Sequence, residues 1–220
     1  MSQLTLNFGP PSPPGLDNFV AGRNRECLAA LRALLEQLRE RTSPSNRFLY
    51  VWGPKGSGKS HLATALKAQR LEQLTVVDDC HRLAETEQEQ LFHRFNAMTQ
   101  SPGLALVAFG DAPPARLSLM PELASRLSWG MVFGLEPLDD DELQTAIEHA
   151  ARERGLSIAG DVSGYLLRHT RRDMAALKVI LDGLDRLSLE QKRPVTLPLL
   201  RTLLKGDTEK SPQRMPDRIP

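Results

Sequence analysis

The chain has 220 residues, of which 40% are apolar and 25% charged, and its formal net charge is +1. This length and apolar content are typical of a globular protein that buries a core of its own. A near-zero net charge disfavours a protein that coats duplex DNA through phosphate contacts. The two cysteines, Cys27 and Cys80, form no CxxC pair, so a zinc module or a disulfide framework is not expected.

Nothing at the start of the chain resembles a signal peptide, and no apolar run reaches the roughly 18 residues that span a bilayer. We therefore expect a cytoplasmic protein that makes no membrane contact. The first residues are rich in proline, which forbids regular helix and favours an extended, solvated segment. Residues 1–15 are accordingly predicted to form a disordered leash.

Residues 24–40 contain leucines at the spacing of one helical face, which predicts an amphipathic helix. These leucines are Leu28, Leu31, Leu34, Leu35 and Leu38. The apolar run at 48–52 then predicts a strand that is buried on both faces. A glycine-rich turn follows, and a helix is expected from Ser60 to about Gln73.

Alternation of strands and helices continues through the middle of the chain. Apolar runs predict strands at 74–77, 104–109 and 131–135, and a helix is expected at 87–99. This order is typical of an α/β domain with a parallel sheet, here over residues 16–138.

After Pro137 only helical patterns occur, and Asp139 is a good cap for the first of them. Helices are expected near 139–154, 161–169, 173–189 and 197–204. We therefore predict a small helical domain over 139–205, followed by a disordered tail at 206–220.

The segment between the first strand and the next helix matches the phosphate-binding pattern G-x-x-x-x-G-K-[ST] in full. Its residues are Gly53, Pro54, Lys55, Gly56, Ser57, Gly58, Lys59 and Ser60. Glycines let backbone N–H groups turn inward around phosphates, and the helix N-terminus adds positive potential. Lys59 is expected to reach the β- and γ-phosphates, and the Ser60 hydroxyl to ligate Mg²⁺.

Carboxylates follow two of the predicted strands. Asp78 is a candidate to hold Mg²⁺ through water, and Asp79 to polarise an attacking water. Asp111 lies where a side chain touches the γ-phosphate or the attacking water. The alternative for all three is an ordinary polar turn at a strand end.

Arg126 lies on a predicted short helix just before the fourth strand. An arginine at this point is a candidate finger that acts in trans on the nucleotide of a neighbouring subunit. The alternative is a solvated surface arginine without a role in catalysis.

These segments resemble the AAA+ ATPases, and within them the DnaA family with its short Hda branch. Residues 53–60 and 78–79 are similar to the Walker A and Walker B motifs. Residues 110–114 resemble sensor 1, and 123–130 resemble box VII, whose arginine is the finger. Residues 16–22 resemble the segment that packs near adenine in initiators.

The resemblance implies that the chain binds ADP or ATP with Mg²⁺. It places Phe19 and His61 at the nucleotide, beside the phosphate loop. It also implies that Arg126 acts on a partner and that Asp79 belongs to the catalytic set.

A peptide near the start of the chain narrows the resemblance to the Hda branch. Its residues Gln3, Leu4, Leu6 and Phe8 are similar to the motif by which such proteins dock on the DNA polymerase sliding clamp. No helix-turn-helix pattern follows the predicted lid, so contact with DNA is expected to be indirect.

The sequence departs from the family pattern in two places. Only 14 residues separate Ser60 from Thr75, which leaves room for one helix, so we expect an edge strand of the usual sheet to be missing. The sensor 2 arginine of the family is replaced by Ala175, which cannot reach a phosphate. Weak or no intrinsic ATPase activity is therefore expected, unless Arg171 or Arg172 substitutes.

The hypothesis that follows is a negative regulator of replication initiation, docked on the clamp and stimulating ATP hydrolysis by DnaA. Homo-oligomers remain possible, because a new sheet edge invites pairing. One alternative is a free-standing AAA+ ATPase that remodels replication proteins. The other is an adaptor that loads DnaA at the origin.

Overall fold

The computed structural model describes residues 13–208, except 157, 159, 171–173 and 192–195. The predicted clamp peptide lies outside the described residues, as do most of the predicted leash and most of the predicted C-terminal tail. Residues 206–208, predicted to belong to the tail, are the last residues of a helix. The chain divides into two compact units, with the boundary between Leu138 and Asp139. Each unit is described by itself below.

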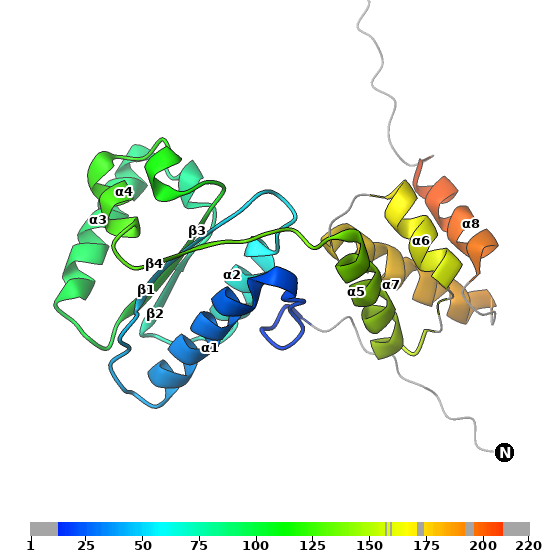
Figure 1. Ribbon diagram of the computed structural model, residues 1–220, viewed down its shortest axis with the longest axis horizontal. Helices are drawn as coiled ribbons and strands as arrows, with labels where there is room; N and C mark the ends of the chain where they lie inside the picture. The colour runs from blue at the N-terminus through cyan, green and yellow to red at the C-terminus, as the bar shows by residue number, and fades with distance from the viewer. Residues whose placement is uncertain (1–12, 157, 159, 171–173, 192–195, 209–220) are drawn as a thin grey trace, which may run out of the picture. The chain divides into compact units, whose positions relative to one another are not determined.

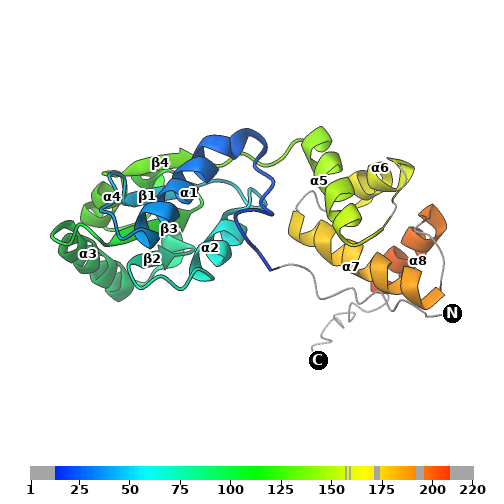
Figure 2. The same ribbon diagram turned by 90° about the horizontal axis from the view of Figure 1, so that it is seen from below.

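The first unit is built on a parallel sheet of four strands. They are β1 (Phe48–Trp52), β2 (Leu74–Val77), β3 (Ala105–Gly110) and β4 (Met131–Gly134). The strand order is β2-β3-β1-β4, as the view in Figure 2 shows. The predicted parallel α/β sheet is confirmed. Within the described part of the chain β2 pairs with β3 only, so it forms an edge of the sheet. This agrees with the expectation that an edge strand of the usual sheet is missing.

Helices cover both faces of the sheet (Figure 1). One layer holds α1 (Arg25–Arg39) and α2 (Lys59–Lys67), and the other holds α3 (Glu85–Thr99) and α4 (Pro121–Leu127). Alternate residues of β1 serve the two cores: Leu49 and Val51 pack with α1 and α2, and Tyr50 packs with α3 and α4. The leucine stripe predicted for α1 is buried in the first core.

Helix α2 is shorter than predicted. It ends at Lys67 rather than near Gln73, and the chain turns at Arg70, whose φ is 51°. The amides of Gln69 and Arg70 close this end with bonds to carbonyls three residues earlier, Leu66 O and Lys67 O. Strand β2 runs parallel to β3, so it must begin at the same end of the sheet as β3. The residues between the end of α2 at Lys67 and the start of β2 at Leu74 bring the chain back to that end.

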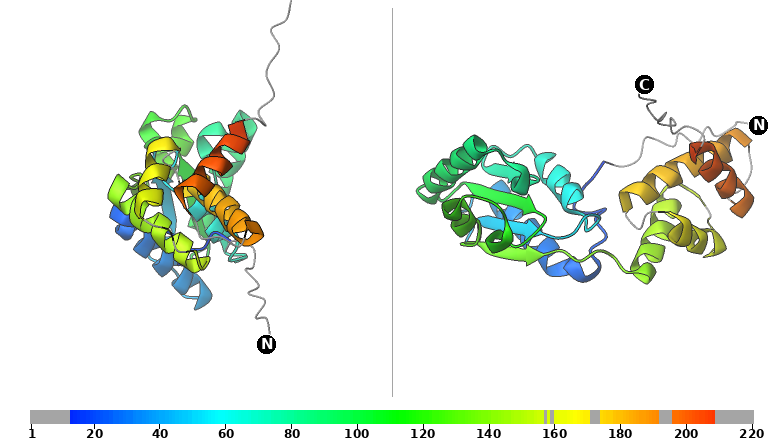
Figure 3. Two further views of the ribbon diagram at one scale, coloured as in Figure 1. Left: turned by 90° about the vertical axis from the view of Figure 1, so that its right-hand side faces the viewer. Right: turned by 90° about the horizontal axis from the view of Figure 1, so that it is seen from above.

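The second unit is a set of four helices (Figure 3). They are α5 (Asp140–Glu153), α6 (Gly160–His169), α7 (Met174–Gln191) and α8 (Leu197–Thr208). Asp139 caps α5 as predicted, because its Oδ1 accepts from the Glu142 amide at 2.9 Å and Glu142 Oε2 accepts from the Asp139 amide at 3.0 Å. A half-buried ion pair of 2.8 Å between Arg154 and Asp182 ties the end of α5 to α7.

No helix within the described residues combines the length and the apolar character that a membrane crossing requires.

Candidate functional site

The phosphate-binding loop connects the carboxyl end of β1 to the first turn of α2, the context that the motif requires. Gly58 has a φ of 96°, and a Cβ there would lie 2.6 Å from the Phe19 ring. Both the left-handed backbone and this contact therefore require glycine. Helix α2 begins at the next residue, so its free N–H groups lie at the loop, where an anion is stabilised.

Lys59 lies folded over the loop in this structure. Its ammonium donates hydrogen bonds to the carbonyls of Gly53 at 2.6 Å and Pro54 at 3.0 Å. Burial lowers the pKa of Lys59 from its ordinary value, while the nearby carboxylates act in the opposite sense. These are Asp79, Asp111 and Asp78, so the structure brings the three predicted acids around the predicted phosphate-binding lysine.

The two acids after β2 are fixed by the backbone as well as by side chains. Asp79 has a left-handed φ of 50°, and its amide donates to Asp78 Oδ1 at 3.0 Å. Arg82 approaches the Asp79 carboxylate to 3.5 Å. Aspartate tolerates this left-handed conformation in turns, so both the functional role and the turn alternative stay open for these two acids.

Asp111 follows β3 and meets His81, which the sequence did not single out. His81 Nε2 lies 3.7 Å from Asp111 Oδ2, and the histidine side chain is 17% exposed against 56% for the aspartate. The Tyr50 hydroxyl donates to Ala112 O at 2.7 Å and anchors the loop that carries Asp111. The only sequence signal for His81 was its position just after the paired acids.

The residues present fit a nucleotide with Mg²⁺. No group of three or more His, Cys, Asp or Glu side chains in the described ranges could hold a metal alone. Mg²⁺ in nucleotide sites needs only one or two protein ligands, because phosphates and water supply the rest. The exposed Ser60 at the start of α2 and Asp78 at the end of β2 suit this role.

Phe19 and His61 lie beside the loop, as the resemblance implies. Their ring centroids are 5.6 Å apart, and His61 Nε2 donates to the Gly15 carbonyl at 2.9 Å. The loop residues Pro54, Lys55 and Gly56 are exposed. Ser57 differs from them, because its hydroxyl is buried and has no hydrogen-bond partner among the described residues.

Arg126 is half-buried and held by three contacts. Its Nε donates to Asn96 Oδ1 at 2.9 Å. Its guanidinium carbon lies 5.4 Å from the centre of the Trp129 ring and 5.9 Å from that of Phe92. Arg126 is therefore packed against protein as well as solvated, and its role as a finger stays a prediction. Asn96 and Phe92 come from α3, thirty positions or more before Arg126 in the chain, so only the fold reveals them.

Arg126 and the phosphate-binding loop lie at opposite ends of β1. The Trp129 ring next to Arg126 is parallel to that of Phe48, the first residue of β1. The loop instead follows Trp52, the last residue of the strand, about 13 Å away at the usual rise per residue. The guanidinium, packed on Trp129, is therefore far from the phosphates of its own loop.

Comparison with known proteins identifies the family of the chain. Residues 139–204 match the model of the Hda lid domain, and 67–134 match the model of the bacterial DnaA ATPase domain. The chain is an AAA+ protein of the DnaA family. The predicted family membership is confirmed.

Solved structures show the same fold at low sequence identity. Domain III of DnaA from Thermotoga maritima is 21% identical with a TM-score of 0.70, over 90% of this chain and 98% of that one. AMPPCP-bound DnaA from Aquifex aeolicus is 20% identical with a TM-score of 0.70, over 93% and 72% of the two chains. The RuvB branch migration motor of Thermotoga maritima is 16% identical with a TM-score of 0.65, over 88% and 72%.

Two predictions concern residues that the structure does not describe. Gln3, Leu4, Leu6 and Phe8 of the predicted clamp peptide precede the first described residue. The side chain of Ala175 is likewise outside the described set, as are Arg171 and Arg172.

Proposed function

We propose that this AAA+ protein is a negative regulator of replication initiation that supplies Arg126 in trans to the ATP bound by DnaA. The observation that carries the proposal is the place of Arg126. It is fixed at the amino end of the sheet, whereas the chain's own phosphate-binding loop lies at the carboxyl end. A guanidinium held there contacts the phosphates of a nucleotide that another protomer binds.

The contacts of Arg126 leave its terminal nitrogens available. Asn96 engages only Nε, and no described residue accepts from the two terminal nitrogens. Phe92 and Trp129 hold the plane of the guanidinium. A preorganised guanidinium stabilises the charge that develops on the transferred phosphoryl group, an effect of about 10³–10⁵ in rate in GTPase systems.

The chain's own nucleotide site has a separate role in this proposal. Lys59 and the loop amides bind the phosphates of ADP or ATP, and Ser60 and Asp78 hold Mg²⁺, which neutralises phosphate charge. Phe19 and His61 border the site beside Gly58. We infer that this nucleotide stabilises the form of the protein that meets DnaA.

Docking on the sliding clamp completes the proposal. Leu4, Leu6 and Phe8 have the alternation of an extended peptide that places apolar side chains in a pocket, with Gln3 at its edge. The proline-rich segment that follows serves as a tether. DNA is then reached through the clamp.

A free-standing ATPase is the second candidate, and one observation favours it. Asp78, Asp79 and Asp111 all lie close enough to Lys59 to act on its pKa, so the acidic side of a hydrolytic site is present. Substantial ATP turnover by the isolated protein would support this candidate. Turnover only on ATP-loaded DnaA supports the regulator, and direct loading of DnaA at an origin supports an adaptor.

The test is a reconstituted assay with DNA-loaded clamp and DnaA carrying labelled ATP. Wild-type protein is expected to accelerate conversion of the label to ADP, and Arg126→Ala to abolish that acceleration while retaining nucleotide and clamp binding. If Arg126 only ties α4 to α3, Arg126→Ala lowers the melting temperature but still stimulates DnaA fully. That result would overturn the assignment.

A further inference from the structure

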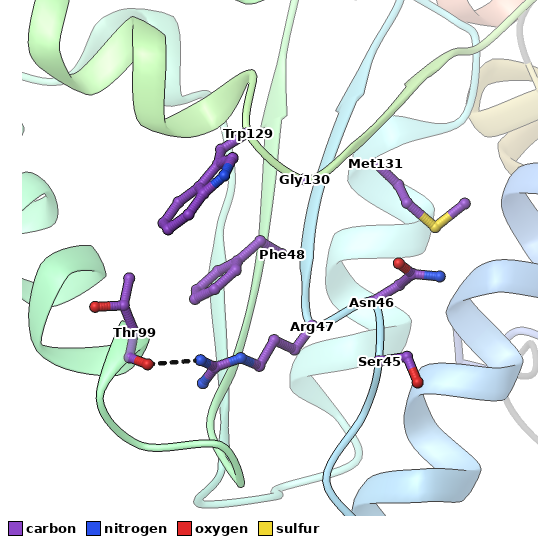
Figure 4. A pocket seen from close by; sticks show the side chains of 8 residues that line it. All are labelled: Ser45, Asn46, Arg47, Phe48, Thr99, Trp129, Gly130 and Met131. Carbon is purple, nitrogen blue, oxygen red and sulfur yellow. Dashed lines mark hydrogen bonds between the residues drawn. The ribbon is translucent and has the colours of Figure 1, made fainter.

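A cavity of about 400 Å³ opens at the amino ends of β1 and β4, away from the phosphate-binding loop (Figure 4). It is lined by Ser45, Asn46, Arg47, Phe48, Thr99, Trp129, Gly130 and Met131. None of these residues carries a carboxylate. The volume lies in the range of pockets that accept a side chain or a small ligand.

The walls of this cavity are rigid. Arg47 donates to the carbonyls of Met98 at 2.6 Å and Thr99 at 2.8 Å, which fixes the end of α3. Its guanidinium carbon lies 4.9 Å from the centre of the Phe48 ring. A Cβ at Gly130 would lie 1.9 Å from Phe48 O, so the loop before β4 is pinned against β1. The cavity is therefore formed before anything enters it.

Trp129 stands in this pinned loop, yet its side chain is 62% exposed. Its ring lies nearly parallel to that of Phe48, at 8° and with centroids 6.5 Å apart, as Figure 4 shows. Behind these two rings lies the buried Phe95, whose ring centroid is 6.1 Å from that of Trp129. A large apolar ring that is rigid and exposed marks a binding surface.

The cavity is continuous with the proposed finger, because the ring of Trp129 also carries the guanidinium of Arg126 at 5.4 Å. We infer that the cavity accepts an apolar side chain of the DnaA protomer whose ATP meets Arg126. This inference rests on the proposed function. The chemistry of the surface fits such a partner, since a cation for a phosphate lies beside a cavity with two aromatic rings in its wall. The charged lining residue, Arg47, is already bonded to the Met98 and Thr99 carbonyls. Trp129 supplies affinity and orientation, and Arg126 supplies the catalytic charge.

The experiment separates binding of ATP-loaded DnaA from the hydrolysis that binding stimulates. Trp129→Ala is expected to raise the Kd for ATP-loaded DnaA at least tenfold. It should also lower the stimulated rate at saturation, because the Trp129 ring packs on the Arg126 guanidinium. Trp129→Phe is expected to restore most of the affinity, because a flat ring remains. Arg126→Ala is expected to show its loss in rate and not in Kd.

Two further variants serve as controls. Val179→Ala removes an apolar side chain of equal exposure, 67%, from α7 and is expected to change neither quantity. Asn46→Trp fills the cavity from an exposed loop and removes no contact of Arg126. It is expected to raise the Kd for DnaA as Trp129→Ala does and to leave the stimulated rate at saturation within about twofold. This variant keeps the test valid even if Trp129→Ala is unstable.

The possible failures are distinguishable. If Trp129→Ala and Asn46→Trp bind DnaA like the wild type, the cavity inference is wrong. The proposed role of Arg126 as the finger is then unaffected. If these variants instead keep DnaA binding but lose binding of a labelled single-stranded oligonucleotide, the cavity binds nucleic acid and the inference is overturned. If Arg126→Ala stimulates fully, the proposed function itself fails.

Discussion

At the scale of single residues, Arg126 depends on Asn96 for its orientation. The Asn96 side chain accepts from Nε and so leaves the two terminal nitrogens of the guanidinium for a ligand. Asn96→Ala is expected to lower the stimulation of DnaA ATP hydrolysis about tenfold, since losing one hydrogen bond to a charged group removes roughly 1.5 kcal/mol. The measurement is the rate of hydrolysis at saturating protein.

Asn96→Gln is the matched control for this change. It keeps an amide oxygen that can accept from Arg126 and adds no charge beside the guanidinium, so it should preserve most of the stimulation. A loss as large as that of Asn96→Ala would contradict the positioning role, because a retained acceptor would then be insufficient.

At the scale of elements, α5 is the helix whose start is best defined by local chemistry. Asp139 and Glu142 satisfy each other's amides in a capping box. Asp139→Ala is expected to lower the free energy of unfolding by about 1 kcal/mol, because the Glu142 amide at the helix start loses its side-chain acceptor. Urea denaturation followed by circular dichroism measures this change. Asp139→Ser keeps an acceptor oxygen and should cost much less, so equal losses would argue against the cap.

The elements also show what a sequence can predict. The four strands and the helix faces follow from apolar spacing, and the phosphate-binding loop follows from its motif, because both are local patterns. The sequence predicted the end of α2 near Gln73, which is wrong, because the helix ends at Lys67. The need to bring β2 beside β3 is a tertiary constraint that local patterns do not contain. Asn96 and His81 could not be assigned roles, because their partners come from other elements.

At the scale of the whole molecule, the two candidate sites use opposite ends of the same sheet. One end carries Lys59 and the acids around it, and the other carries Arg126 and Trp129. Under the proposed function, this separation lets the protein hold its own nucleotide at one end of the sheet and meet that of DnaA at the other. It also explains why the sequence motifs alone left the choice between regulator and free-standing ATPase open, since both need the same loop.

We expect docking on the clamp to raise the local concentration of the protein near DnaA, and to take no part in the hydrolysis step. A flexible linker raises the effective concentration of a second binding event toward the millimolar range. Replacing Leu6 and Phe8 by Ala should therefore abolish stimulation when the protein is at nanomolar concentration with DNA-loaded clamp, and excess protein at micromolar concentration should restore it. Asn7→Ala, in the same peptide but at an alternate position, should behave like the wild type. If excess protein cannot rescue the double variant, the clamp contributes to the reaction itself and a passive tether is insufficient.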